Sequence, residues 1–141
     1  MRTKTLRIFV ALLIAGFAYV GNASAQCDSI AKICAKNVTA NYISDGQSYR
    51  ALLNGDQVAE FRATFYGGST YRIAGCSGFT EGNLIFEIYD EDHNQLFASS
   101  DYKNAPYWDF AFASTVDCTI EAKLNTVNVQ SGCATMVIGF K

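Results

Sequence analysis

Residues 118–124 read CTIEAKL, and this stretch decides the fold class of the chain. Apolar and polar side chains alternate at every position, which is typical of a β-strand with one buried face and one solvated face. The same period of two recurs in residues 60–65, 84–89 and 108–113. The chain is therefore expected to be built mainly of half-buried strands.

Turn-forming residues separate these stretches. We expect Gly67-Gly68-Ser69 to form the loop of a hairpin, and residues 90–94 to connect the strand 84–89 to a strand at 95–99. About eight short strands with turn signals between them predict a mainly β fold, an antiparallel, jelly-roll-like β-sandwich. A parallel α/β architecture is excluded, because no helical pattern lies between the strands to serve as a crossover.

One helix is predicted before the strands. Between Asp28 and Tyr42 the apolar residues recur at steps of three and four, at Ile30, Ile33, Cys34, Val38 and Tyr42. Asp28 is the predicted N-cap, and Asp45-Gly46 marks the exit. The 141 residues suffice for one domain, so we expect this helix and its exit turn in residues 26–45 to pack on a sandwich domain of residues 46–141.

The first 25 residues have the pattern of a secretory signal peptide. Arg2, Lys4 and Arg7 precede an apolar run of 13 residues from position 8 to 20, which is shorter than a membrane-spanning helix. The small residues Ala23-Ser24-Ala25 then predict cleavage after Ala25. We expect a secreted or periplasmic protein without stable membrane insertion after cleavage. The alternatives are an uncleaved anchor and a lipid on Cys27, the latter disfavoured because Gln26 stands where a small residue is needed.

The charge of the chain excludes one class of partner. Without the three basic residues of the signal, 8 basic side chains stand against 13 acidic ones. Such a chain is not expected to bind nucleic acid through phosphate contacts. A single histidine, His93, also excludes catalysis built on several histidines.

Five cysteines follow the predicted cleavage position: Cys27, Cys34, Cys76, Cys118 and Cys133. In an exported protein they predict at least one disulfide. If the first two lie on one helix, their separation exceeds the reach of a disulfide, and several other pairings stay open. We favour a bridge from Cys27 or Cys34 to a cysteine on a strand. The fifth cysteine is expected to be a small buried residue, the alternatives being a covalent contact with a partner or a catalytic thiol.

Three segments resemble a known group of domains: YRIA at 71–74, FEIYDEDHN at 86–94 and MVIGF at 136–140. They are similar to bacterial pre-peptidase C-terminal domains, which are small jelly-roll-like sandwiches appended to secreted enzymes. The chain also resembles a family of uncharacterised secreted proteins from Bacteroidota that end in a similar Ser-Gly-Cys…Ile-Gly-Phe-Lys segment. The resemblance covers residues 46–141 and implies the fold. It does not imply an enzyme's appended role, because no peptidase domain stands in these residues.

The acidic turn is the sharpest local motif. Asp90, Asp92 and Asn94 place oxygen atoms at alternate positions, as at the start of a calcium-binding loop. The later ligands of such a loop are absent, so a solvated turn held by its own Asp and Asn hydrogen bonds is the favoured interpretation. A weak Ca²⁺ site is the alternative, and no other cofactor is expected.

Catalytic residues are not expected. His93 lies at a turn without a nucleophile motif near it. Glu87 and Glu121 are the only acids considered as a glycosidase pair, and solvated strand faces explain them better.

Aromatic side chains near the predicted turns could stack on a sugar or anchor a peptide: Tyr66, Tyr71, Tyr102, Tyr107 and Trp108. Packing inside the sandwich is the favoured interpretation of the same rings, and a binding patch is the alternative. The sequence thus favours a non-catalytic binding module for an unknown protein or glycan. A carbohydrate-binding module that uses these rings is the alternative, and a hydrolase comes third.

Overall fold

The computed structural model describes residues 22–38 and 41–141. In these residues one α-helix precedes nine β-strands, so the predicted mainly β fold with one N-terminal helix is confirmed. The elements are α2 (Asn22–Ala35), β1 (Ile43–Ser44), β2 (Tyr49–Asn54), β3 (Val58–Phe65), β4 (Thr70–Cys76), β5 (Leu84–Tyr89), β6 (Gln95–Ala98), the 3₁₀ turn η1 (Ser99–Tyr102), β7 (Tyr107–Ala111), β8 (Val116–Leu124) and β9 (Ser131–Phe140). The basic and apolar part of the predicted signal segment lies outside the described residues.

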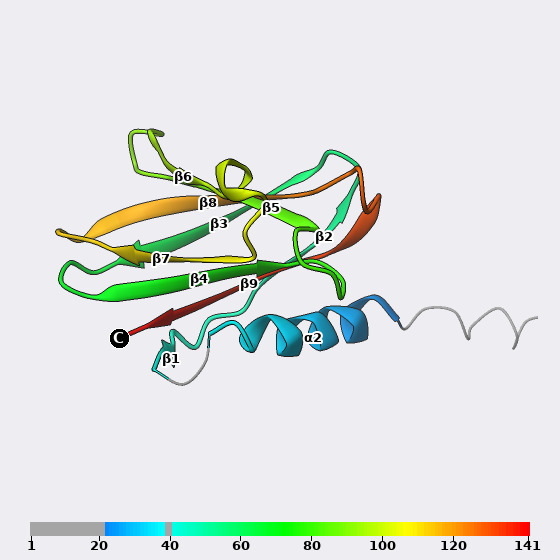
Figure 1. The fold of residues 1–141 in the computed structure, drawn as a ribbon, viewed down its shortest axis with the longest axis horizontal. Helices are drawn as coiled ribbons and strands as arrows, with labels where there is room; N and C mark the ends of the chain where they lie inside the picture. Colours follow the sequence, from blue (N-terminus) through cyan, green and yellow to red (C-terminus); the bar gives the residue numbers. More distant parts are fainter. Residues whose placement is uncertain (1–21, 39–40) are drawn as a thin grey trace, which may run out of the picture.

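The strands form two antiparallel sheets. The five-stranded sheet has the order β1-β9-β4-β7, with β2 pairing with β9 farther along the edge where β1 pairs. The four-stranded sheet has the order β3-β8-β5-β6. Figure 1 shows the sheets stacked, with α2 lying along the five-stranded sheet on the side away from the four-stranded one. The layers are therefore helix, five-stranded sheet and four-stranded sheet.

The main core lies between the sheets. The inward positions of β8 alternate as its sequence predicts, because Cys118, Ile120, Ala122 and Leu124 are all buried. Residues of both sheets complete this core, among them Phe65, Ile73, Phe86, Ile88, Met136 and Ile138. The outward positions of β8 are left to solvent, and they become the floor of the site described below.

The predicted hairpin at Gly67-Gly68-Ser69 is wrong. β3 pairs with β8 in one sheet, whereas β4 pairs with β7 and β9 in the other. The glycine turn therefore carries the chain across the sandwich, with a hydrogen bond from the Gly68 amide to the carbonyl oxygen of Phe112 at 2.9 Å. The predicted hairpin at 90–94 is confirmed, since β5 and β6 pair with each other.

Two disulfides fasten the helix to the five-stranded sheet. Cys27 is bonded to Cys133 of β9, and Cys34 to Cys76 at the end of β4. This confirms the expected link between the helix and strand cysteines. The Cys27 sulfur is bonded to another sulfur, so it is not available for a lipid. Ile30, with no exposed surface, packs between these bridges.

The helix bounds differ from the sequence prediction. α2 begins at Asn22, on the N-terminal side of the predicted cleavage after Ala25, and it ends at Ala35 instead of continuing to Tyr42. Asp28 is therefore no N-cap; it lies within the helix and forms an ion pair with Arg50 of β2. Tyr42 has the spacing of a helix face but stacks against the guanidinium of Arg72 on the sheet. No helix in the described residues is long and apolar enough to cross a membrane.

Candidate functional site

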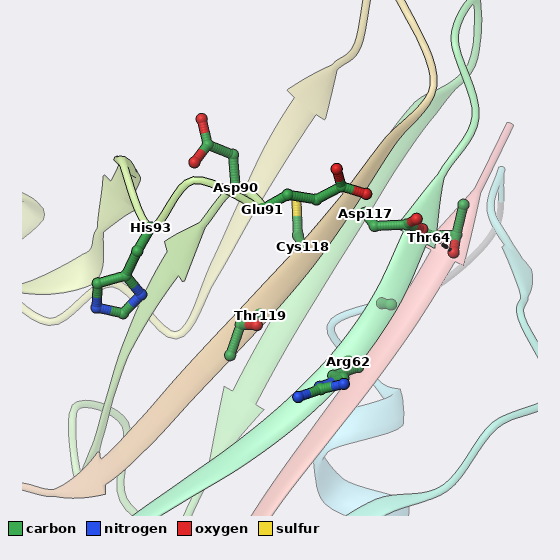
Figure 2. A pocket seen from close by; sticks show the side chains of 9 residues that line it. Arg62, Thr64, Asp90, Glu91, His93, Asp117, Cys118 and Thr119 are labelled. Carbon is green, nitrogen blue, oxygen red and sulfur yellow. Dashed lines mark hydrogen bonds between the residues drawn. The ribbon is translucent and has the colours of Figure 1, made fainter.

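An open depression of about 520 Å³ lies on the outer face of the four-stranded sheet. Strand β3 contributes Arg62 and Thr64, and β8 contributes Thr119 to its floor. The turn between β5 and β6 contributes Asp90, Glu91 and His93 to the remaining wall. Figure 2 shows His93 and Arg62 on opposite sides of Thr119.

The turn is held by hydrogen bonds between its first and last residues. The Asp90 amide donates to the Asn94 carbonyl oxygen at 3.0 Å, and the Asn94 amide donates to Asp90 Oδ1 at 2.8 Å. Asn94 Nδ2 donates to Asp90 Oδ2 at 3.0 Å. These bonds, that from the side chain of Asn94 above all, hold the pKa of Asp90 below its ordinary value. Both Asp90 oxygens thus accept hydrogen bonds within the turn, as the favoured interpretation of this motif requires.

Ca²⁺ binding at Asp90, Asp92 and Asn94 stays a prediction. Asp90, the first of the three, already directs its carboxylate at Asn94 rather than at an open coordination position. Within the described part of the chain, no group of three or more His, Cys, Asp or Glu side chains is placed to hold a metal ion.

His93 is fixed in place by its backbone and its ring. Its φ of 60° lies in the left-handed region, which few residues other than glycine adopt, and its amide donates to the Asp90 carbonyl oxygen at 3.0 Å. The imidazole stacks on the ring of Tyr89, with centroids 4.5 Å apart and planes 10° apart. Tyr89 in turn donates a hydrogen bond from its hydroxyl to Glu87. This bond and burial raise the pKa of Tyr89 to about 12.

The floor of the site follows from strand register. Arg62 of β3 lies opposite Thr119 of β8, and Thr119 lies opposite Tyr89 of β5. Since neighbouring strands are about 4.8 Å apart, these three residues form one row across the sheet. Among the described residues, neither the guanidinium of Arg62 nor the hydroxyl of Thr119 has a hydrogen-bond or ion-pair partner. The row therefore presents free donors to solvent.

The other end of the depression is acidic. Glu91 extends over Cys118 toward Asp117, which accepts a hydrogen bond from the Thr64 hydroxyl (Figure 2). The thiol of Cys118 is itself buried, and burial raises its pKa to about 11. Cys118 is therefore the small buried cysteine that the sequence led us to expect.

The two glutamates considered as a catalytic pair lie on the same face. Glu87 and Glu121 are direct neighbours on β5 and β8, and Glu60 of β3 lies opposite Glu121 on its other side. Glu87 accepts hydrogen bonds from Tyr89 and from Lys123, the latter at 3.3 Å, and these lower its pKa. The three carboxylates thus form a second row beside the row of Arg62.

The five predicted aromatic residues do not form one patch. Tyr71 is buried, which agrees with packing inside the sandwich and removes its ring from the alternative of a binding patch. It lies on the same strand face as Ile73, as their spacing of two in the sequence indicates. Tyr66 is exposed near it and donates its amide to the Tyr71 hydroxyl at 2.9 Å. Tyr107 lies on the outer face of the five-stranded sheet, where its ring packs against Arg72.

Tyr102 and Trp108 are the only two of these five residues whose rings contact each other. Their centroids are 4.2 Å apart, and both rings contact Phe97 between the edge strands β6 and β7. Tyr102 is half-exposed and Trp108 is partly buried. This pair is the part of the predicted aromatic patch that a sugar ring could reach.

Arg62 and Thr119 were not among the residues predicted from the sequence. Their outward positions on alternating strands were readable from it. Their proximity was not, because it depends on the pairing of β3 with β8 across more than fifty residues.

No protein-family model and no curated protein matches the sequence. Among solved structures, the chain is similar to the crystal structure of Aeromonas hydrophila PliG, a periplasmic lysozyme inhibitor of g-type lysozyme, with a TM-score of 0.52 and 9% identity over 72% of this chain and 89% of that one. A de novo designed double-stranded β-helix, solved by NMR, aligns with a TM-score of 0.35 and 9% identity over 67% of this chain and 99% of the design. The first likeness shows a shared fold, and at these identities it shows the fold alone.

Proposed function

We propose that this chain is an exported, non-catalytic module that binds another protein through the outer face of its four-stranded sheet. The observation that carries the proposal is the pair of Arg62 and Thr119 in their row across the sheet, with His93 stacked on Tyr89 at the end of that row. The backbone of each is fixed on a strand or in a tight turn, and the side chains of Arg62 and Thr119 have no partner among the described residues. Such donors can bond to a partner without giving up a hydrogen bond within this protein.

The shape of the site supports a protein as the partner. The depression is open, and its floor is the face of a sheet, whereas small-molecule sites are usually enclosed and mostly apolar. The Aeromonas hydrophila protein of the same fold is an inhibitor of lysozyme, so the fold serves there in the recognition of a protein. Export is supported by the two disulfides, which are typical of oxidising compartments, together with the signal-like first 25 residues.

Site-specific photocrosslinking tests the proposal. We would place p-benzoylphenylalanine at Thr119 on the site, and at Lys32 on the exposed side of α2 as the matched control. We expect irradiation of the cells that export the protein to give an adduct with a second protein from Thr119 and not from Lys32. No adduct from Thr119, or equal adducts from both positions, would overturn the proposal.

Carbohydrate binding is the second candidate, favoured by the contact between Tyr102 and Trp108. In this case a glycan array would give binding that Tyr102→Ala abolishes and that Thr119→Ala leaves unchanged. Such a result, together with no protein adduct at Thr119, would favour a glycan over a protein as the partner.

The first 25 residues and the Bacteroidota resemblance enter the proposal as well. We propose cleavage after Ala25, and N-terminal sequencing of the exported protein should then begin at Gln26.

We also propose that the secreted Bacteroidota proteins that this chain resembles share its sandwich, which the structure of one of them would test.

A further inference from the structure

Strand β3 is an unusually open edge of the sandwich. It pairs with β8, and within the described residues no strand pairs with its other side. Of the strands at the sheet edges it is the longest, with eight residues against six in β2, five in β7 and four in β6. Its inward residues Phe61 and Ala63 are half-exposed, although their partners Ile120 and Cys118 on β8 are buried. Solvent therefore reaches this edge from the inner side too.

Two hollows meet at the same three residues of β3. The depression of Figure 2 lies on the outer face and is lined by Arg62, Ala63 and Thr64. A second hollow, of about 420 Å³, is lined by the same three residues and lies between β3 and the segment 45–49. Its other lining residues include Asp45, Gln47, Tyr49 and Tyr66. Residues 62–64 thus separate a polar hollow from one whose lining combines polar groups with the accessible rings of Tyr49 and Tyr66.

We propose that an extended segment of a protein partner adds to the free edge of β3 at residues 62–64, as a fifth strand of this sheet. This inference rests on the proposed protein-binding function and names the form of the partner. Successive side chains of a strand point to opposite faces, so one set would enter the outer depression and the other the inner hollow. In this mode of recognition, backbone hydrogen bonds supply affinity and the alternate pockets supply specificity.

Charge and polarity define the sequence of that segment. Arg62 is the cation of the outer face next to the edge, and it forms no ion pair within the described chain. A carboxylate on the added strand would lie opposite it, at cross-strand distance. The side chains before and after that carboxylate would face the inner hollow, where Tyr49, Ala63 and Tyr66 are accessible. The partner segment therefore has one acidic residue with an apolar residue on each side.

The charged outer side chains of β3 also restrict which strand fits this edge. Edge strands are commonly guarded by charges that oppose pairing with a second copy. On β3 these charges are Glu60 and Arg62, so a fitting strand places a carboxylate opposite Arg62 and none opposite Glu60.

Peptide selection tests the proposal while the partner protein is unidentified. The probe is a library of random linear nonapeptides displayed on phage, selected against the exported protein with both disulfides intact. We expect enriched peptides to share an acidic residue with an apolar residue on each side. An Arg62→Glu variant should instead enrich peptides in which a basic residue replaces the acidic one.

Hydrogen exchange then locates the bound peptide. An enriched peptide, made synthetically, should slow amide exchange in residues 61–65 and leave β6 and β7 unchanged. Ala63→Leu narrows the inner hollow and should weaken binding at least tenfold. Ala111→Leu, the same change on the edge strand β7, is the matched control and should not alter binding. Thermal melting of both variants verifies that they fold.

The outcomes are distinct from those of the crosslinking test. No enrichment, enrichment of peptides without an acidic residue between apolar ones, or protection away from β3 would overturn strand addition. If Thr119 still gives its protein adduct, the proposed function stands and only the form of the partner is wrong. If selection succeeds while Thr119 gives no adduct, the outer-face site is wrong and the β3 edge alone is retained.

Discussion

The two sheets have outer faces of opposite character. The outer face of the five-stranded sheet is covered by α2, which is attached by two disulfides and buries Ile30 completely. No helix or strand of the described residues covers the outer face of the four-stranded sheet, which carries rows of charged and hydroxyl side chains. One face contributes stability to the fold, whereas the other leaves its polar groups available to a partner.

The charge pattern of the open face strengthens this contrast. Glu60, Glu121 and Glu87 lie side by side on three strands, and like charges directly opposite each other destabilise a sheet. On the covered face, Arg72 instead donates to both oxygens of Asp109, at 2.6 and 2.8 Å, between the rings of Tyr42 and Tyr107. The covered face satisfies its charges internally, while the open face retains unsatisfied ones, as a binding surface does.

Removal of the longer disulfide should have the largest effect on stability. The bridge between Cys27 and Cys133 joins residues 106 apart in sequence. Its loss in Cys27→Ala with Cys133→Ala frees the unfolded chain, which should lower the free energy of unfolding by about 4–5 kcal/mol. Denaturation in guanidinium chloride measures the change. Cys118→Ala is the control, since it removes a buried sulfur without a bridge and should cost about 1 kcal/mol. Equal losses would mean that the bridge adds nothing beyond packing.

The same substitution, isoleucine to alanine, can compare how much the two outer faces contribute to stability. Ile30→Ala leaves a cavity between α2 and β9 and should cost about 3 kcal/mol. Ile85→Ala removes the same atoms from a half-buried position on the open face and should cost less than about 1 kcal/mol. Urea unfolding of both variants measures the difference. A cost at Ile30 no greater than at Ile85 would mean that the helix is not firmly packed in solution.

The alternation of apolar and polar residues predicted the strands, because it depends only on residues that are neighbours in the sequence. β5 spans the residues 84–89 that the alternation predicts, and β8 adds two residues to the predicted 118–124. The helix was predicted too far along the chain, since the spacing of Val38 and Tyr42 also suits a helix face. In the structure, Tyr42 packs on Arg72 of β4, a contact between residues distant in sequence.

Strand partners could not be read from the same signal. A glycine turn between two alternating strands suits a hairpin and a crossing between sheets equally, and at Gly67-Gly68-Ser69 the chain crosses. The site could not be predicted for the same reason, since the sequence does not show which strands pair. Arg62 and Thr119 become neighbours only through the register of β3 and β8. The turn at 90–94 could be predicted from the sequence, because its hydrogen bonds join residues within one stretch of five.

The ion pair on the covered face should give a pH-dependent contribution of moderate size. Hydrogen bonds from Arg72 hold the pKa of Asp109 below its ordinary value. A carboxylate with a lowered folded-state pKa adds stability above its unfolded pKa, near 4, and loses it as the pH falls through the folded value. Because the pair is partly exposed, we expect a contribution of roughly 0.5 kcal/mol. The melting temperatures of the wild type and Asp109→Asn should therefore differ at pH 7 and converge toward pH 3. A constant difference in melting temperature across this pH range would contradict a stabilisation that depends on the ionised carboxylate of Asp109.

The row of glutamates should give an effect no larger than that of the ion pair, and one of opposite sign. Glu121 has a glutamate directly opposite on each side, so Glu121→Gln removes two repulsive pairs and keeps the shape of the side chain. We expect stability to rise by about 0.5 kcal/mol, seen as a melting temperature about 2 °C higher in low salt. Sodium chloride at 1 M should remove most of the gain, because it screens exposed charges within a few ångströms. Glu81→Gln, an exposed loop position, is the matched control and should change neither value. A destabilised Glu121→Gln would mean that this carboxylate supports the fold, and the open face could then no longer be regarded as one that sacrifices stability for binding.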